Sequence, residues 1–312
     1  MTPGMIGAVE FRFYRFRFHF RAIGSLHFPS GKSANLVRGA FGASLRRVAC
    51  EEQCPGTEAC EIAASCAYAR IFQPGTAKAG PSGLADWPRP FVFRAAHLDG
   101  LTIRPDQRFH FDVHVFDVRD PALAWYTKAF AQLAREGLGP GRAKAELEAV
   151  ECLGRNGGPG ICVSPGDVLP PPLVLDLAPE TASRLLVRFL TPTELKTGTG
   201  PAQRPEFGIL FARARDRLST LRALYGEGPL AIDFRAMGER AANVKLARWD
   251  WGRVEVERRS SRTGQTHSLG GFVAKRSTRA MWASFCPICE PPAGPASGGR
   301  LFGERERSRF RR

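Results

Sequence analysis

The sequence predicts an α+β fold made of two tandem units, each a sheet with helices packed on it. In the first half, strands of alternating apolar and polar residues are interleaved with helices that carry an apolar stripe. In the second half a similar series begins again. Between them, residues 155–180 are rich in Gly and Pro and mark a linker. A chain of 312 residues is long enough for two domains, each with its own core.

The first unit, residues 1–154, has the order β-α-β-β-α-β. Its first strand, Val9–Arg21, shows a phase slip near Phe13–Tyr14, as a β-bulge gives, and a helix capped by Ser33 follows to about Val48. The later elements are strands at Phe91–Arg94 and Arg108–Asp117, a helix from Pro121 to Gly137, and a strand at Leu147–Leu153. This order is that of the ferredoxin-like unit. A Cys-rich insert, residues 50–90, interrupts it.

The second unit, residues 181–273, begins in the same way and stops early. We expect a strand at Leu185–Leu190, a helix at Phe207–Tyr225, and a hairpin formed by Val244–Arg258 and Gln265–Val273. A ferredoxin-like unit needs one more helix and one more strand. The predicted fold class is therefore α+β, with two tandem ferredoxin-like domains, the second incomplete.

Residues 274–312 have a different character from the rest. They are rich in Pro, Gly, Ser and Arg and follow neither a helical nor a strand period, which is typical of disordered segments. A frameshift after about Val273 would explain this. One permitted reading in another frame contains a helix-like segment and a Gly-rich strand, which are the two elements that the second unit lacks. The alternative is a natural basic tail. In both cases we expect residues 274–312 to lack a consistent packed structure.

Composition narrows the classes of function. The formal net charge is +15, which favours a polyanionic partner, and nucleic acid is the first candidate. No run of 18 apolar residues is present, so we expect no membrane span. The N-terminus lacks an apolar signal segment before its first arginines, so we expect a cytoplasmic protein.

Four of the eight cysteines are clustered. Cys50, Cys54, Cys60 and Cys66 have the spacing C-x3-C-x5-C-x5-C. In a reducing cytoplasm, such a set suits a structural zinc ion or an iron–sulfur cluster better than disulfides. The spacing is wider than the C-x2-C pairs of common zinc sites, and free buried thiols are the alternative.

The stretch Gly31–Phe72 resembles the signature of one family. In that signature a glycine-flanked "LRGAFG-x-x-LR" helix leads into a cysteine cluster that ends in "C-x-Y". The family is that of the CRISPR-associated RAMP-superfamily endoribonucleases, which process precursor CRISPR RNA. The residues that carry the resemblance are Leu36, Arg38, Gly39, Phe41, Gly42, Leu45, Arg46, Cys50, Cys54, Cys60, Cys66 and Tyr68.

The resemblance implies that the chain binds the repeat of a precursor CRISPR RNA and cuts it without a catalytic metal. The ribose 2′-hydroxyl would attack the adjacent phosphate, which requires a proton acceptor, cations and an acid. His27 is the candidate base or acid, with Lys32 and Arg38 as phosphate clamps and Tyr14 nearby on the preceding strand. The N-terminus of the first helix is itself an expected anion site. Ala43 stands where related sequences often carry a histidine.

Further basic groups are candidates for RNA binding. The Gly-rich loop Gly137–Lys144 resembles a loop of RAMP proteins and offers Arg142 and Lys144. The complete candidate set is Arg38, Arg46, Arg142, Lys144, Arg258, Arg259 and Arg262. The polar faces of the two long strands are either a further RNA surface or an ordinary solvated face.

Two other functions remain open on the sequence. The chain is either a processing enzyme, a non-catalytic RAMP subunit that holds guide RNA in an interference complex, or an inactive frameshifted product. The expected partners are therefore precursor CRISPR RNA and, for the second reading, other subunits of such a complex.

Overall fold

The structure is a computed structural model. It describes residues 10–50, 54–57, 59–75, 87–155, 159–176, 183–187, 189, 193–197, 200–248, 252–259, 266–273 and 280–283. Within this part, no helix is both long and apolar enough to cross a bilayer.

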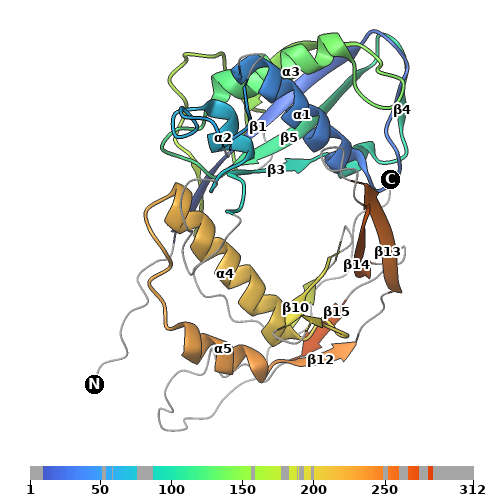
Figure 1. The fold of residues 1–312 in the computed structure, drawn as a ribbon. Coiled ribbons are helices and arrows are strands. Elements are labelled where there is room, and N and C mark those ends of the chain that lie inside the picture. The colour runs from blue at the N-terminus through green and yellow to red at the C-terminus, as the bar shows by residue number, and fades with distance from the viewer. Residues whose placement is uncertain are drawn as a thin grey trace.

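The N-terminal domain is a ferredoxin-like unit, as predicted. Its sheet has the order β3 (Phe91–Arg94), β5 (Arg108–Val115), β1 (Glu10–Ala22) and β6 (Ala145–Cys152), and each neighbouring pair is antiparallel. This is the spatial order 2-3-1-4 of the β-α-β-β-α-β unit. The helices α1 (Ser33–Ala49) and α3 (Leu123–Glu136) cover one face of the sheet, and the C-terminal elements lie on the other side (Figure 1).

Aromatic packing holds α1 and α3 on the sheet. The alternation of β1 places Phe16, Phe18 and Phe20 on the covered face, where all three are buried. Phe41 of α1 is fully buried among five other rings, with its own ring 4.9 Å from that of Phe130 on α3. The predicted phase slip near Phe13–Tyr14 has no support: Phe11 and Tyr14 are buried in two different clusters, and the register shift found in β1 lies between His19 and Phe20, beside β6.

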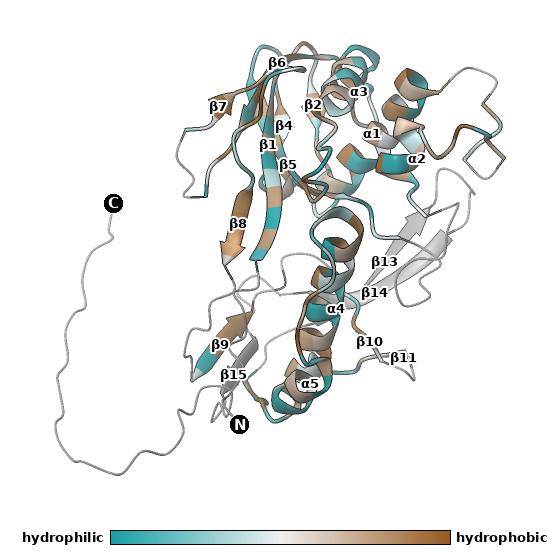
Figure 2. Cartoon of the chain, turned by 90° about the vertical axis from the view of Figure 1, so that its left-hand side faces the viewer, coloured by the Kyte–Doolittle hydropathy of each residue, from teal (hydrophilic) through white to brown (hydrophobic). Residues whose placement is uncertain are grey.

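Smaller elements surround this unit. Two short strands, β2 (Leu26–His27) and β4 (Thr102–Ile103), pair at the end of β1. The 3-10 helix η2 (Ala96–Leu98) lies between β3 and β4, and α2 (Ala67–Phe72) follows the cysteine-rich loop. Beyond β6 lie β7 (Ile161–Cys162) and β8 (Leu173–Asp176), and β8 extends the sheet beside the first residues of β1 (Figure 2).

The second domain repeats part of the order. The described elements are β9 (Arg184–Val187), β10 (Lys196–Thr197), β11 (Gly200–Pro201), α4 (Phe207–Tyr225), α5 (Phe234–Ala242), β12 (Lys245–Arg248), β13 (Gly252–Arg259), β14 (Thr266–Val273) and β15 (Ala280–Ala283). The sheet order β12-β15-β9 equals positions 2-3-1 of a ferredoxin-like unit, and a fourth strand is not found among the described residues.

Two sequence expectations about this domain need correction. The expected strand Val244–Arg258 is two strands, because β12 pairs with β15 whereas β13 pairs only with β14 as a separate hairpin. The expectation that residues 274–312 lack packed structure is wrong at Ala280–Ala283, which form β15 between β12 and β9. The other tail residues lie outside the described part, and no finding supports the frameshift.

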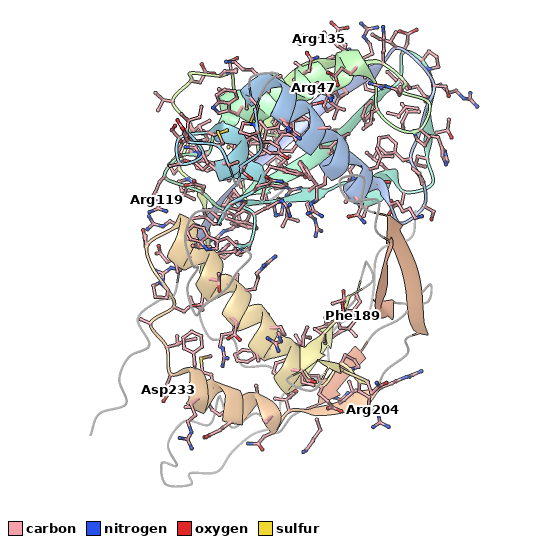
Figure 3. The ribbon with its side chains drawn as sticks, in the orientation of Figure 1. Arg47, Arg119, Arg135, Phe189, Arg204 and Asp233 are labelled. Carbon is pink, nitrogen blue, oxygen red and sulfur yellow. The ribbon has the colours of Figure 1, made fainter. Side chains whose placement is uncertain are left out.

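The two domains meet at the end of α4. Leu221 and Tyr225 pack against Phe11, and the Tyr225 hydroxyl donates to the carbonyl of Pro88 at 2.7 Å. Arg119 donates to the carbonyl of Leu224 at the same junction, where Figure 3 shows its side chain. The start of β1 is therefore shared by the cores of both domains.

The position of β15 gives a first prediction. A chain shortened after Val273 should lose the central strand of the second sheet, leaving β12 and β9 without a shared partner. We expect its C-terminal domain to melt at least about 5 °C lower than that of the full chain. A chain ending after Phe285 keeps β15 and is the matched control. Calorimetry measures the melting temperature of each shortened chain. Equal values for the two chains would contradict the role of β15.

Candidate functional site

The open face of the N-terminal sheet carries many arginines, and most of them are paired. Asp112 on β5 lies between Arg15 and Arg17 of β1, with nitrogen–oxygen distances of 2.6 and 2.7 Å. Burial alone would raise the pKa of Asp112, but the hydrogen bonds from Arg17 and Arg15 outweigh it and hold the pKa below its ordinary value. Asp112 is therefore an anion that neutralises part of this face.

The same pattern continues along the strands. Arg108 contacts Glu148 at 2.8 Å, and Arg21 contacts Glu146 and Glu148. His19 lies 3.2 Å from a carboxylate oxygen of Glu151. These carboxylates come mainly from β6, the strand next to β1. Four of the arginines on this face thus already have carboxylate partners.

The other histidines of this face add little charge. Burial, Arg94 and Arg15 lower the pKa of His114 to about 4. Burial, Arg17 and His97 also lower the pKa of His110, whose ring stacks on that of His97 at 4.7 Å. His110 and His114 are therefore neutral near pH 7. The positive and negative side chains of the open face therefore nearly cancel, and this face attracts phosphates only weakly.

A different set of groups gathers at the end of β1, around His27. His27 is exposed on β2, and its Nδ1 lies 3.0 Å from the Thr102 hydroxyl of β4. This bond fixes the imidazole and leaves Nε2 without a partner among the described residues. His27 therefore has the exposure and the anchoring that a general acid or base needs.

The Gly-rich loop after α3 packs directly beside His27. Gly137 and Gly139 have φ angles of +98° and +80°, a region that favours glycine. A Cβ at Gly139 would lie 3.2 Å from Leu26 Cδ1 and 3.5 Å from the His27 carbonyl oxygen, so the loop backbone touches β2. The amides of Ile23 and Gly24 both donate to the Lys144 carbonyl, at 2.9 and 3.1 Å. The loop and β2 thus form one surface.

Basic side chains surround this surface. Lys32, Arg104 and Lys144 are exposed, and no carboxylate partner is found for them within the described ranges. Arg142 is exposed as well, and its Nε donates to the carbonyl of Glu136 at 3.4 Å. Arg142 also lies close enough to the Glu136 carboxylate to help lower the pKa of that group. His27 and these four cations, called the His27 patch below, combine a titratable group with positive charge that is largely available to an anion.

The structure does not bring every predicted residue to this patch. Tyr14 is buried at the far end of β1, seven residues from Arg21 and so roughly 23 Å away along the strand. Burial raises its pKa. Tyr14 is therefore not a neighbour of His27. Arg38 is half-buried on α1, and Arg46 lies near the opposite end of that helix, beside Cys54.

The N-terminus of α1 is also different from the expectation. Ser33 is the first helical residue rather than the cap, and its amide and hydroxyl both donate to Asp99 Oδ1, at 3.0 and 2.5 Å. A carboxylate of the chain itself therefore occupies the place where a phosphate was expected. Asp99 follows η2 and is 66 positions away in sequence, so no local pattern predicts this cap.

The remaining basic candidates lie on the β13–β14 hairpin. Arg258 and Arg259 stand opposite His267 and Thr266 near its closed end. Arg262 lies outside the described residues. Thr102 and Arg104 are site residues that the sequence reasoning missed. They lie in a loop-rich segment whose pairing with β2 is only two residues long and leaves no periodic signal.

The four clustered cysteines are brought together. Cys50 ends α1 and Cys66 precedes α2, while Cys54 and Cys60 lie in the loop between the two helices. Burial, Cys66 and Cys54 raise the pKa of Cys50 to about 12. In the described part, no group of three or more His, Cys, Asp or Glu side chains already has the geometry of a metal site.

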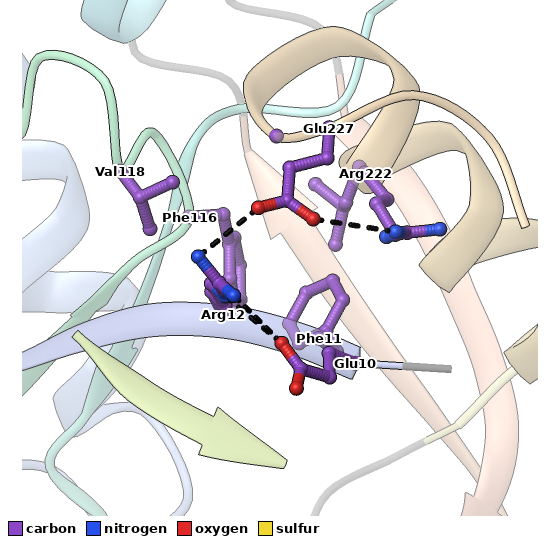
Figure 4. A pocket seen from close by; sticks show the side chains of 9 residues that line it. Glu10, Phe11, Arg12, Phe116, Val118, Arg222 and Glu227 are labelled. Atoms are coloured by element: carbon purple, nitrogen blue, oxygen red, sulfur yellow. Dashed lines mark hydrogen bonds and ion pairs between the residues drawn. The ribbon is translucent and has the colours of Figure 1, made fainter. Parts of the chain in front are cut away.

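A small pocket lies at the domain junction, and ion pairs fill its mouth. Arg12 lies between Glu10 and Glu227, at 2.8 and 3.0 Å, and Arg222 also approaches Glu227 (Figure 4). Phe11 and Phe116 form its apolar wall. These charged side chains already form ion pairs with one another. The pocket therefore belongs to the contact between the two domains and is not a candidate binding site.

Comparison with known proteins places the chain in a family. The family described as the AF_1859_N N-terminal domain matches residues 11–172, which is more than half of the chain. The chain belongs to this family. The match begins at the junction residue Phe11 and ends just before β8, so the AF_1859_N domain comprises β1 to β7 and contains the His27 patch. No curated protein matches the chain.

Solved structures resemble the chain at low identity. One is described as "Cas6 (TTHB231) product complex". It is 16% identical to this chain, the match covers 88% of this chain and 86% of the solved chain, and the TM-score is 0.48. Another, "Cas6 (TTHA0078) product complex", is 14% identical over 88% of this chain and 84% of the solved chain, with a TM-score of 0.44. A third, "An RAMP protein binding different RNA substrates", is 9% identical over 87% of this chain and 88% of the solved chain, with a TM-score of 0.35. Likeness at this level says nothing about activity.

The Asp112 pair gives a second prediction. Asp112→Asn leaves Arg15 and Arg17 on a partly buried face without their anion, and we expect a loss of about 2–4 kcal/mol in unfolding free energy near pH 7. Glu148→Gln, at the more exposed pair with Arg108, should cost much less. Urea unfolding of both variants measures the difference.

The pH dependence of this loss follows from the lowered pKa of Asp112. The contribution of the pair is complete above the ordinary aspartate pKa of about 4 and disappears as the pH falls through the lower folded-state value. The difference between native chain and Asp112→Asn should therefore shrink in acid. A difference that stays constant down to the acid transition would contradict the ionised pair.

Proposed function

We propose that the chain binds the repeat of a precursor CRISPR RNA and cuts it at one phosphodiester, by attack of the ribose 2′-hydroxyl. The observation that carries the proposal is the His27 patch. It joins an anchored histidine to Lys32, Arg104 and Lys144, for which no carboxylate partner is found in the described part, at the edge of a Gly-rich loop. The motif in Gly31–Phe72 that resembles CRISPR-associated RAMP endoribonucleases supports the choice of substrate.

The proposed reaction makes and breaks one bond to phosphorus. The 2′-oxygen bonds to the phosphorus and loses its proton to a base, while the bond to the 5′-oxygen breaks and that oxygen receives a proton. The products are a 2′,3′-cyclic phosphate and a 5′-hydroxyl end. Because the nucleophile belongs to the RNA itself, the reaction as proposed requires a proton carrier and cations and no metal-bound water.

The chain supplies these groups as follows. His27, held through Nδ1 by Thr102, presents Nε2 to exchange the proton of the 2′- or the 5′-oxygen. Lys144 and Lys32 stabilise the extra negative charge on the phosphorane. Gly139 has no side chain, which allows the loop that carries Arg142 and Lys144 to pack closely against β2. Tyr14 takes no part, because it is buried elsewhere.

The charge distribution favours this patch over the sheet face. An RNA that bound across β1 and β5 would have to compete with Asp112 and Glu148 for the arginines and with Glu151 for His19. At the His27 patch, no carboxylate of the described part has to be displaced from Lys32 or Lys144. Phosphate therefore gains more at the patch than on the open face. Arg258 and Arg259 on the hairpin are proposed as a second contact with the RNA.

A non-catalytic role is the second candidate, because Ala43 replaces a histidine that related sequences often carry. In that case the chain would hold guide RNA beside other subunits of an interference complex. Either role belongs in the cytoplasm, where the transcript is made. Cleavage separates the two roles.

The third prediction concerns His27. The chain, incubated with the RNA of a CRISPR repeat, should cut it once in the presence of a chelator and leave a cyclic phosphate. His27→Ala should slow the cut by about a hundredfold or more while the binding constant changes by less than about threefold. His97→Ala, on η2 where its ring stacks on that of His110, is the matched control and should cut at the native rate.

Substrate chemistry gives the outcome that would contradict the mechanism. An RNA with a 2′-deoxyribose at the cut position should bind as well as the native RNA and remain uncut. Cutting of this analogue, or a strict need for Mg²⁺, would rule out attack by the 2′-hydroxyl. Tight binding of the native repeat without any cut would favour the holding role.

A further inference from the structure

The proposed base and one of the proposed phosphate clamps lie on the same short loop, residues 27–33, called the His27 loop below. A second segment, residues 99–102, lies beside this loop and is called the brace. The brace is flanked by Leu98 and Ile103, whose side chains are both buried. Its two ends are therefore anchored in the core of the N-terminal domain, and the brace can serve as a fixed support for the loop.

The brace first contacts the His27 loop at its start. The Thr102 hydroxyl lies 3.0 Å from Nδ1 of His27. Directly after His27, the Phe28 amide donates to the Leu101 carbonyl at 2.8 Å, and the Gly100 amide donates to the Phe28 carbonyl at 2.9 Å. The Phe28 side chain is fully buried. Both the imidazole and the backbone next to it are thus fixed by the brace.

The brace contacts the end of the loop through Asp99. Its Oδ1 accepts hydrogen bonds from the amide and the hydroxyl of Ser33, at 3.0 and 2.5 Å, and Ser33 is fully buried. Amides in the first turn of a helix have no partner within the helix, and the cap residue Lys32 forms no side-chain cap bond. Asp99 therefore takes over the role of the cap and fixes the start of α1.

A tight turn closes the loop between these two anchors. The Lys32 amide donates to the Pro29 carbonyl at 3.1 Å, and Gly31 has a φ angle of +68°. This is the third position of the turn, where a left-handed backbone favours glycine. Because Lys32 ends the turn and directly precedes Ser33, the position of its backbone depends on the hydrogen bonds to Asp99.

We propose that the brace sets the spacing between His27 and Lys32 in the RNA site, and that Asp99 is the positioning residue for Lys32. The inference rests on the proposed function, since it assigns a part to both groups. Asp99 acts through Ser33 and the loop backbone. A displacement of a reacting group by about 1 Å lowers a rate by up to about a hundredfold, so the brace should affect the cut more than the binding.

Asp99 offers the loop two properties, a hydrogen-bond acceptor and a negative charge. A single oxygen, Oδ1, accepts both hydrogen bonds from Ser33, and the amide oxygen of an asparagine is able to accept the same two. Asp99→Asn therefore keeps the acceptor and removes the charge, whereas Asp99→Ala removes both. The two variants carry the same charge, so a difference between them reports the hydrogen bonds alone.

The fourth prediction compares these variants in the full chain, with the chain in excess over the repeat RNA. Asp99→Ala should slow the cut at least about tenfold, and Asp99→Asn should remain within about threefold of the native rate. Both should bind the uncut 2′-deoxy RNA with the same affinity, because their charge is the same. A general loss of structure in Asp99→Ala would weaken this binding too. Equal cutting rates for the two variants would overturn the positioning role.

Ser33 provides a second test of the same contact. Ser33→Ala removes the hydroxyl donor and should slow the cut in the native chain, but it should add almost nothing to Asp99→Ala, because the acceptor is already absent there. Such non-additivity is expected of residues in direct contact. Fully additive losses in the double variant would show that Asp99 and Ser33 act separately, which contradicts the proposal.

Hydrogen exchange tests the brace without any cleavage. In Asp99→Ala, the amides of Lys32 and Leu36, which are bonded to Pro29 and Lys32, should exchange at least about tenfold faster, and those of α3 should not change. Unchanged exchange at Lys32 and Leu36 would overturn the brace. Faster exchange there, together with a native chain that does not cut the RNA, would keep the brace and reject the proposed cleavage.

Discussion

The carboxylate of Asp112, held between Arg15 and Arg17, determines which charges of the N-terminal domain are available to a partner. With the glutamates of β6 it neutralises the open face of the sheet, although β1 and β5 carry several arginines there. The positive side chains that give the net charge of +15 must therefore be available in other parts of the chain. At the end of β1, Lys32 and Lys144 stand beside His27 without such partners in the described ranges, and the account of function depends on this contrast.

Sequence pattern predicted the N-terminal domain well because its signals are periodic. Alternation in β1 and β5 and the apolar stripe of α3 identify elements in the order of the ferredoxin-like unit, and the observed sheet order 2-3-1-4 is that of this unit. The site was predicted in part. His27, Arg142 and Lys144 were identified from loop composition, but Tyr14 was misplaced, since a strand of 13 residues carries its two ends far apart. Asp99 and Thr102 act across long sequence separations and left no local signal.

In the second domain, the sequence pattern failed to predict one strand. Composition alone classed Ala280–Ala283 with a disordered tail, yet these four residues form the central strand of the second sheet. Four residues are too few for a period to be recognised, and backbone pairing on both sides compensates for their weak pattern. The hairpin β13–β14 was predicted because its strands are longer and its turn contains glycine.

The most direct test of the account is the salt dependence of repeat-RNA binding. The slope of log K against log salt counts the phosphates that the protein neutralises, at about 0.7 per contact for single-stranded RNA. Lys144→Ala should reduce the slope by about that amount, whereas Arg108→Ala, which removes an equally exposed charge already paired with Glu148, should leave it unchanged. The reverse result, with the slope reduced only by Arg108→Ala, would place the RNA on the sheet face and contradict the His27 patch.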